Sequence, residues 1–197
     1  MSTTFDVFAK NNYIPFFNEL FSISTENLNN FLKRHGIMSK IFIRYKLMNK
    51  VTDNVIPISS DDAFFWDDEH YLWIYTDEVE GGTDAYVHEV DDLDLEELKE
   101  TEFIQNQEKP VENFIKQNYY WSFRRSAGQP GIINIMYGII AGTLAKLTDG
   151  IVFSGDCAWE IEAAFGDDFL LFYMEPDKTQ DEESRKWAIE CINSVNS

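Results

Sequence analysis

The chain contains few of the residues that build covalent or metal-bound frameworks. Its 197 residues include two cysteines, Cys157 and Cys191, and three histidines. The two cysteines lie far apart and match no metal or redox spacing, so neither a disulfide scaffold nor a cysteine-based zinc site organises the fold. We therefore expect both thiols to be reduced and the protein to be cytoplasmic.

Long uninterrupted apolar runs are also missing. The longest apolar stretch, residues 132–147, is interrupted by Asn134, two glycines and Thr143, so it is too short and too broken to span a bilayer. The N-terminus begins MSTTFDVFAK and lacks a basic segment followed by a long apolar one. We expect no signal peptide and no membrane association.

Sequence motifs for catalysis or metal binding are lacking as well. His35, His70 and His88 show no H-E-x-x-H or H-x-H spacing. Ser154 is not part of a G-x-S-x-G turn, and the glycine pair around Pro130 has no following lysine to complete a phosphate loop. The acidic residues do not follow the register of a calcium loop. We expect no cofactor, no metal site and no catalytic residue.

Negative charge is what the chain has in excess. It carries 35 acidic and 16 basic residues, which gives a formal net charge of −19. Residues 61–102 alone hold 17 acidic residues and one basic residue, Lys99, so this segment carries −16. A concentrated negative field repels nucleic acid and anionic membranes and attracts basic proteins. The charge pattern predicts a basic protein as partner, and neither nucleic acid nor a membrane.

Aromatic residues interleave with this acidic segment. Phe64, Phe65 and Trp66 stand between two acidic groups, where aromatics would anchor a partner and carboxylates would bind its arginines or lysines. The same aromatics could equally form the inner face of a sheet, beside a merely solvated acidic face. The candidate partner-binding residues are Asp61, Asp62, Phe64, Phe65, Trp66, Asp67, Asp68, Glu69, Asp77, Glu78, Glu80 and Asp84.

Hydrophobic periodicity predicts one α+β domain over residues 1–197, with the acidic segment at 61–102. An antiparallel sheet from the N-terminal half should pack against helices from the C-terminal half. Strands are expected at 40–47, 55–58, 70–75, 85–88 and 151–153. Helices are expected at 24–35, 93–103, 110–120, 132–147, 168–174 and 182–195, with 132–147 the most buried.

A stretch in the C-terminal half resembles a known family. A small-residue helix over 137–148 leads through Asp149 and Gly150 into the apolar strand 151–153 and then the sequence D-C-A-W at 156–159. This order resembles small cytosolic immunity proteins encoded beside polymorphic, contact-dependent or type VI secreted bacterial toxins. The resemblance covers residues 119–175. It implies an acidic, non-enzymatic protein that occludes a cognate toxin, often a basic nuclease.

Charge and resemblance together lead to a non-enzymatic binding protein that neutralises a basic bacterial toxin by occluding it. Two alternatives remain open from the residues. One is a small hydrolase that uses the carboxylates of Asp156 and Glu160 near Arg124. The other is a nucleic-acid mimic whose carboxylates block a DNA-binding protein. The sequence does not predict an oligomeric state.

Overall fold

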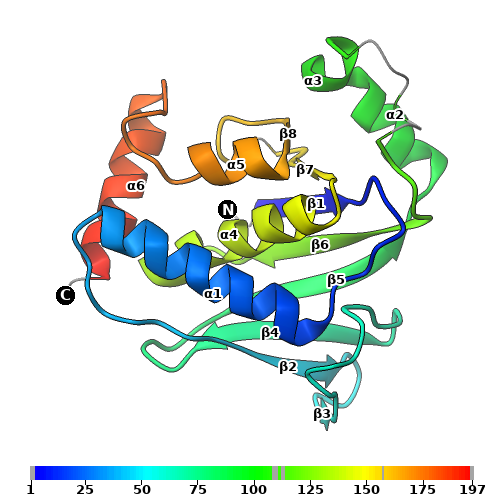
Figure 1. Ribbon diagram of the computed structural model, residues 1–197, viewed down its shortest axis with the longest axis horizontal. Helices are drawn as coiled ribbons and strands as arrows, with labels where there is room; N and C mark the ends of the chain where they lie inside the picture. The colour runs from blue at the N-terminus through cyan, green and yellow to red at the C-terminus, as the bar shows by residue number, and fades with distance from the viewer. Residues whose placement is uncertain (1–2, 108–110, 112–113, 157, 196–197) are drawn as a thin grey trace.

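The computed structural model describes residues 3–107, 111, 114–156 and 158–195. Within these residues, eight strands form one antiparallel sheet in the order β3-β2-β4-β5-β6-β1-β7-β8, accompanied by six helices (Figure 1). The strands are β1 Thr3–Phe8, β2 Ile43–Asn49, β3 Val55–Ile56, β4 His70–Thr76, β5 Thr83–Glu89, β6 Tyr119–Arg125, β7 Ile151–Phe153 and β8 Ala163–Phe165. The helices are α1 Phe17–Arg34, α2 Asp92–Glu100, α3 Glu102–Gln105, α4 Gly131–Leu147, α5 Gly166–Phe172 and α6 Glu182–Ser194.

One face of the sheet carries the main hydrophobic core. Side chains alternate along a strand, so Phe5 and Val7 of β1 are fully buried on this face, together with Trp121 and Phe123 of the neighbouring β6. The Phe5 ring stacks on Tyr137 of α4, with 4.8 Å between ring centroids. Helix α4 is thereby held directly against the centre of the sheet.

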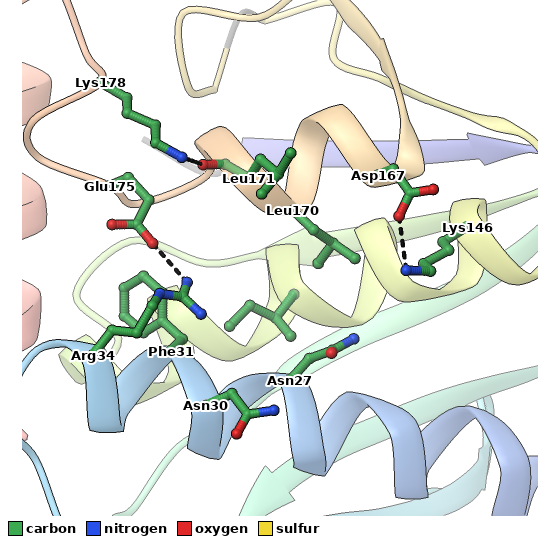
Figure 2. Close-up of a pocket in the computed structure, with 11 residues that line it drawn as sticks. Asn27, Asn30, Phe31, Arg34, Lys146, Asp167, Leu170, Leu171, Glu175 and Lys178 are labelled. Carbon is green, nitrogen blue, oxygen red and sulfur yellow. Dashed lines mark hydrogen bonds and ion pairs between the residues drawn. The ribbon is translucent and has the colours of Figure 1, made fainter.

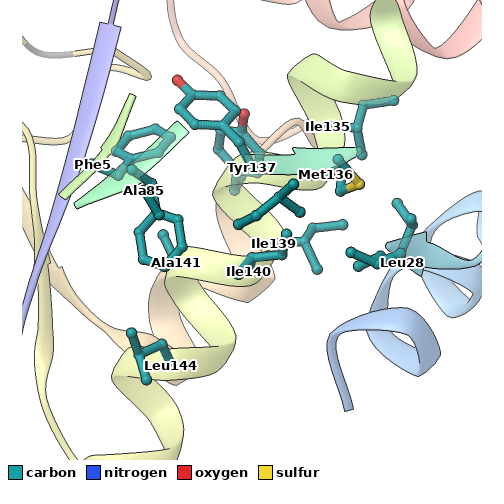
Figure 3. Close-up of a cluster of buried hydrophobic side chains, with 14 of the residues drawn as sticks. Phe5, Leu28, Ala85, Ile135, Met136, Tyr137, Ile139, Ile140, Ala141 and Leu144 are labelled. Atoms are coloured by element: carbon teal, nitrogen blue, oxygen red, sulfur yellow. The ribbon is translucent and has the colours of Figure 1, made fainter. Parts of the chain in front are cut away.

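Helix α4 is the centre of this core. Every residue from Gly131 to Ala145 is buried, because α1, α5 and α6 all contact α4 on the sides that the sheet leaves free. Figure 3 shows α4 between Phe5 of β1 on one side and Leu28 of α1 on the other. The prediction that 132–147 forms the most buried helix is confirmed for the described residues.

Among the described residues, helices cover the opposite face of the sheet only beside β1, β7 and β8. Leu98 of α2 and Ile104 of α3 pack with Phe8, Ile151 and Phe153 in a second, smaller core. Figure 1 shows α2 and α3 away from the other four helices. Over β2 and β6 the same face carries charged residues, and Arg44, Lys46 and Arg124 are exposed there.

The α+β class and most expected elements are confirmed. Strands β1 and β8 are not among the expected elements, and the helix expected at 93–103 is divided into α2 and α3. The expected helix at 110–120 is wrong where it overlaps β6, because residues 119–125 alternate and pair with β1 and β5. The sheet thus takes β6, β7 and β8 from the second half of the chain. Helix α1 begins at Phe17, seven residues before the expected cap at Ser24. Pro110, the first residue of the helix expected at 110–120, lies outside the described residues.

Gly138 tests the close approach of α4 to its neighbours. A Cβ atom on Gly138 would overlap the ring of Tyr173, which is buried and donates a hydrogen bond to the Asn134 carbonyl. We expect Gly138→Ala to lower the free energy of unfolding by about 1–3 kcal/mol through overpacking, although alanine favours a helix. Thermal unfolding followed by circular dichroism measures the change.

Gly142→Ala is the matched control on the same helix. Its added Cβ would lie 2.8 Å from the buried Phe169 ring and 2.9 Å from the partly buried Leu170, which are wider separations than the 2.3 Å from Gly138 to the Tyr173 ring. We expect a smaller loss of stability than for Gly138→Ala. Equal stability of both variants and the wild type would show that α4 does not depend on close packing at Gly138.

Candidate functional site: a groove with an acidic rim

The acidic residues next to β4 fall into two groups, one at each end of this strand. Asp67, Asp68 and Glu69 immediately precede β4, whereas Asp77, Glu78 and Glu80 follow it. A strand of seven residues is about 20 Å long, so the two acidic groups lie about that far apart. The candidate residues therefore do not form one continuous binding face.

Asp61 and Asp62 lie in the loop between β3 and β4 and are exposed. The Asn18 side-chain amide donates to Asp61 at 2.8 Å, and the Ser59 backbone amide donates to Asp62 at 2.8 Å. The first bond fastens the loop to the first turn of α1, and the second lies within the loop. Neither carboxylate lines the groove described below.

The three candidate aromatic anchors separate into two environments. Phe64 is 0% exposed and Trp66 is 5% exposed, whereas Phe65 is 45% exposed. Phe64 packs on Phe17 of α1, and its backbone carbonyl accepts a hydrogen bond from Trp121 Nε1 at 3.0 Å. Of the two roles left open for these aromatics, Phe64 and Trp66 take the inner one, because both pack in the main core, and Phe65 alone of the three is exposed.

Two further candidates have partners of their own. Asp84 is 9% exposed on the open face of the sheet, and Arg124 Nη2 donates to its carboxylate at 3.0 Å. Asp77 accepts from Arg44 Nε at 3.0 Å. Neither carboxylate belongs to the end of the sheet where Asp67 and Phe65 lie.

A groove at the Asp67 end of the sheet brings four of the candidates together. Its volume is about 630 Å³. It is lined by Phe65, Trp66, Asp67, Asp68, Val87, His88, Glu89, Asn118 and Tyr119. Sequence analysis missed the last five of these residues, because the expected helix at 110–120 concealed the pairing of β5 with β6.

Strand register explains why these residues meet. Glu89 is the last residue of β5 and pairs with Tyr119, the first residue of β6. The next residue, Val90, donates its amide to the Asn118 carbonyl at 2.9 Å and so continues the pairing past Glu89. The exposed Phe65 ring meets Tyr119 edge to face, with 4.8 Å between centroids. The loop before β4 is thereby held across the ends of β5 and β6.

The rim of the groove is negatively charged at neutral pH. Asp68 and Glu89 are exposed, and neither forms an ion pair with any described residue. Asp67 accepts a hydrogen bond from the Glu69 amide and pairs with His70. Burial, followed by the nearby charge of Lys50, lowers the pKa of His88, so this histidine adds no positive charge near pH 7.

Two polar atoms in the groove wall lack partners. Trp66 Nε1 and the Tyr119 hydroxyl are both buried, and neither has a hydrogen-bond partner among the described residues. Burial also raises the pKa of Tyr119, so its phenol remains protonated and can both donate and accept. An unsatisfied buried polar group costs about 1–3 kcal/mol, so such groups in a native protein call for an explanation.

A second hollow of about 400 Å³ lies between α1, α4 and α5 (Figure 2). Four of its five charged side chains form ion pairs with one another. Arg34 bonds to Glu175 at 2.6 Å, and Lys146 bonds to Asp167 at 2.7 Å. Lys178 donates to the Leu171 carbonyl. This hollow offers a ligand little uncompensated charge, unlike the groove with the acidic rim.

The residues of the hydrolase alternative serve local structure. Asp156 accepts from the Ser154 hydroxyl at 2.8 Å. Glu160 accepts from the backbone amides of Gln180 and Asp181, at 3.0 and 3.3 Å. Among the described residues, no group of three histidine, cysteine or acidic side chains could hold a metal ion. Within that same part of the chain, no helix combines the length and apolar composition needed to cross a membrane.

A buried carboxyl on β1 lies near several acidic side chains. Asp6 Oδ1 is buried and has no hydrogen-bond partner among the described residues. Burial raises the pKa of Asp6 to about 7, a hydrogen bond with Ser122 opposes the rise, and the charges of Asp94, Glu97 and Asp156 add to it. The Asp6 carboxyl is thus about half protonated near pH 7.

We expect Asp6→Asn to raise stability in a pH-dependent way. The unfolded carboxyl ionises near pH 3.8, but the folded one ionises only near 7, so the wild type loses stability as pH rises between these values. The gain of the variant over the wild type should grow from pH 4 to 7 and then level off, at on the order of 2–4 kcal/mol. Urea unfolding at pH 4.5, 6 and 8 measures it.

The exposed Asp177 provides the control, because Asp177→Asn removes the same charge without burial. The difference in free energy of unfolding between Asp177→Asn and the wild type should stay nearly constant over the same pH range. A gain for Asp6→Asn that is independent of pH would contradict the assignment of a raised pKa to Asp6.

Comparison with protein-family models, with curated proteins and with solved structures finds no match to this chain.

Proposed function

We propose that this chain is a cytoplasmic, non-enzymatic binding protein that neutralises a basic toxin by occluding it. The groove with the acidic rim carries the proposal, because there exposed carboxylates, an exposed aromatic ring and a volume of about 630 Å³ lie together. Cationic side chains of a partner would enter the groove, and Phe65 would be covered by the partner. The proposed partner is a protein with a positively charged surface.

The electrostatics favour fast association with such a partner. A net charge of −19 gives a field that steers cations toward the protein, and steering weakens when salt shortens the Debye length to about 8 Å. Steering alone does not select an orientation. Asp68 and Glu89 would orient the partner, because their unpaired charges lie at the groove.

The contacts of the two carboxylates in the hydrolase alternative favour binding over hydrolysis. The carboxylate of Glu160 accepts two backbone amides, and Asp156 accepts the Ser154 hydroxyl, so both side chains hold loop structure. Neither residue lines the groove. The proposal therefore assigns the protein an inhibitory role that depends on contact area and charge.

Charge reversal at the two acidic ends of β4 tests the proposal. Asp68→Lys/Glu89→Lys changes the charge at the groove, and Glu78→Lys/Glu80→Lys changes it equally at the far turn. We expect the groove variant to weaken binding of the basic domain encoded by the neighbouring gene at least 100-fold, and the turn variant less than fivefold. Surface plasmon resonance at 50 and 300 mM salt gives both rate constants.

The two variants have the same net charge, so a difference between them reports the site and not the overall field. Circular dichroism checks that both fold, because all four residues are exposed and no ion pair among the described residues involves them. Equal weakening by both variants would mean that only net charge matters. Unchanged binding by the groove variant would place the inhibitory surface elsewhere.

A further inference from the structure

We propose that the groove with the acidic rim is a receptor for one arginine side chain of the partner, a role that rests on the function proposed above. The composition of the groove wall favours arginine over lysine. Its planar guanidinium stacks on aromatic rings and bonds to carboxylates, and it is less strongly hydrated than an ammonium group. The groove offers both kinds of contact within one cavity.

The aromatic part of the wall comes from two segments. Phe65 of the loop before β4 and Tyr119 of β6 meet edge to face, so their rings are not coplanar and expose faces in different directions. Phe65 remains 45% exposed, whereas Trp66 beside it is held in the core against Phe64. A guanidinium that covers the Phe65 ring would gain contact without displacing the core.

The acidic part of the wall comes from the same two sides. Asp67 and Asp68 enter from the loop before β4, and Glu89 enters from the end of β5. Asp67 already bonds to His70, which leaves Asp68 and Glu89 as the carboxylates without an ion pair among the described residues. The five N–H donors of one guanidinium can bond to more than one carboxylate, which the compact ammonium of lysine does less well.

The unpaired polar atoms of the wall fit an arginine residue and its backbone. The Tyr119 hydroxyl can accept from a guanidinium, and Trp66 Nε1 can donate to the backbone carbonyl of the same residue. Both atoms are covered in the free protein, so side chains beside them must move to admit either bond. Formation of these bonds would remove the cost of leaving both groups unsatisfied.

Titration of the isotope-labelled full chain with short peptides tests this proposal. The probes are acetyl-Gly-Arg-Gly-amide, the same peptide with lysine, and the same peptide with citrulline, which has the shape of arginine without its charge. Nuclear magnetic resonance follows the indole N–H of Trp66, assigned with Trp66→Phe, and the backbone amides of Glu89 and Glu78. We expect saturable binding of the arginine peptide at about millimolar concentration.

Four results support the proposal together. The arginine peptide shifts the Trp66 indole and the Glu89 amide but not the Glu78 amide, and it binds at least tenfold tighter than the citrulline peptide. It binds at least threefold tighter than the lysine peptide. Asp68→Asn/Glu89→Gln lowers its affinity at least fivefold, whereas Glu78→Gln/Glu80→Gln leaves it unchanged. Equal binding of arginine and citrulline, or equal shifts at both acidic ends, overturns the proposal, and equal binding of lysine overturns the choice of arginine.

The outcome separates this inference from the function on which it rests. If the arginine peptide fails to bind but Asp68→Lys/Glu89→Lys still abolishes binding of the basic domain, the result supports the inhibitory function and contradicts the proposal of an arginine receptor. If the peptide binds but the basic domain is insensitive to the groove variant, the receptor stands and the proposed function falls.

Discussion

The structure depends on the burial of α4 from all sides. A helix whose residues 131–145 are all buried cannot be covered by a sheet alone, so three other helices must surround it. The fit is close, because a Cβ atom on Gly138 would overlap the Tyr173 ring, and because Phe5 stacks directly on Tyr137. Once α4 is held in this way, α1, α5 and α6 are fixed with it on one face of the sheet. The other face is left for α2 and α3 at one end and for charged side chains elsewhere.

This arrangement decides where the negative charge can act. The segment 61–102 includes β4, β5 and α2, and the antiparallel pairing of β4 with β5 places its acidic residues at both ends of the hairpin. At the turn between the two strands, Arg44 pairs with one carboxylate, Asp77. At the opposite end, the loop before β4 crosses the ends of β5 and β6, and carboxylates gather beside a hollow that holds Phe65 and Tyr119. Strand register, more than composition, converts an acidic segment into a groove.

The sequence predicts the local elements well and the site only in part. Alternation identifies β2, β4 and β5, and the small-residue pattern of residues 132–147 identifies α4, because these signals lie within a few residues of one another. The groove depends on Glu89 meeting Tyr119, a pairing across 30 residues that no local pattern encodes. The aromatic run 119–123 fits a helix or a strand, and only its partners β1 and β5 decide between them. Phe64 and Trp66 were indistinguishable from Phe65 for the same reason, since burial depends on where α1 lies.

Like charges gathered at one end of a sheet repel one another, and the folded protein bears that cost in isolation. Away from the groove, Asp6 avoids such a cost by binding a proton near neutral pH, because burial raises its pKa to about 7 and the nearby charges of Asp94, Glu97 and Asp156 add to the rise. At the groove, Asp68 and Glu89 are exposed and form no ion pair with any described residue. Water and counterions screen them in the free protein, and a cationic side chain held between aromatic rings would screen them better. The same repulsion that lowers the stability of the free chain would therefore become part of its affinity for a basic partner.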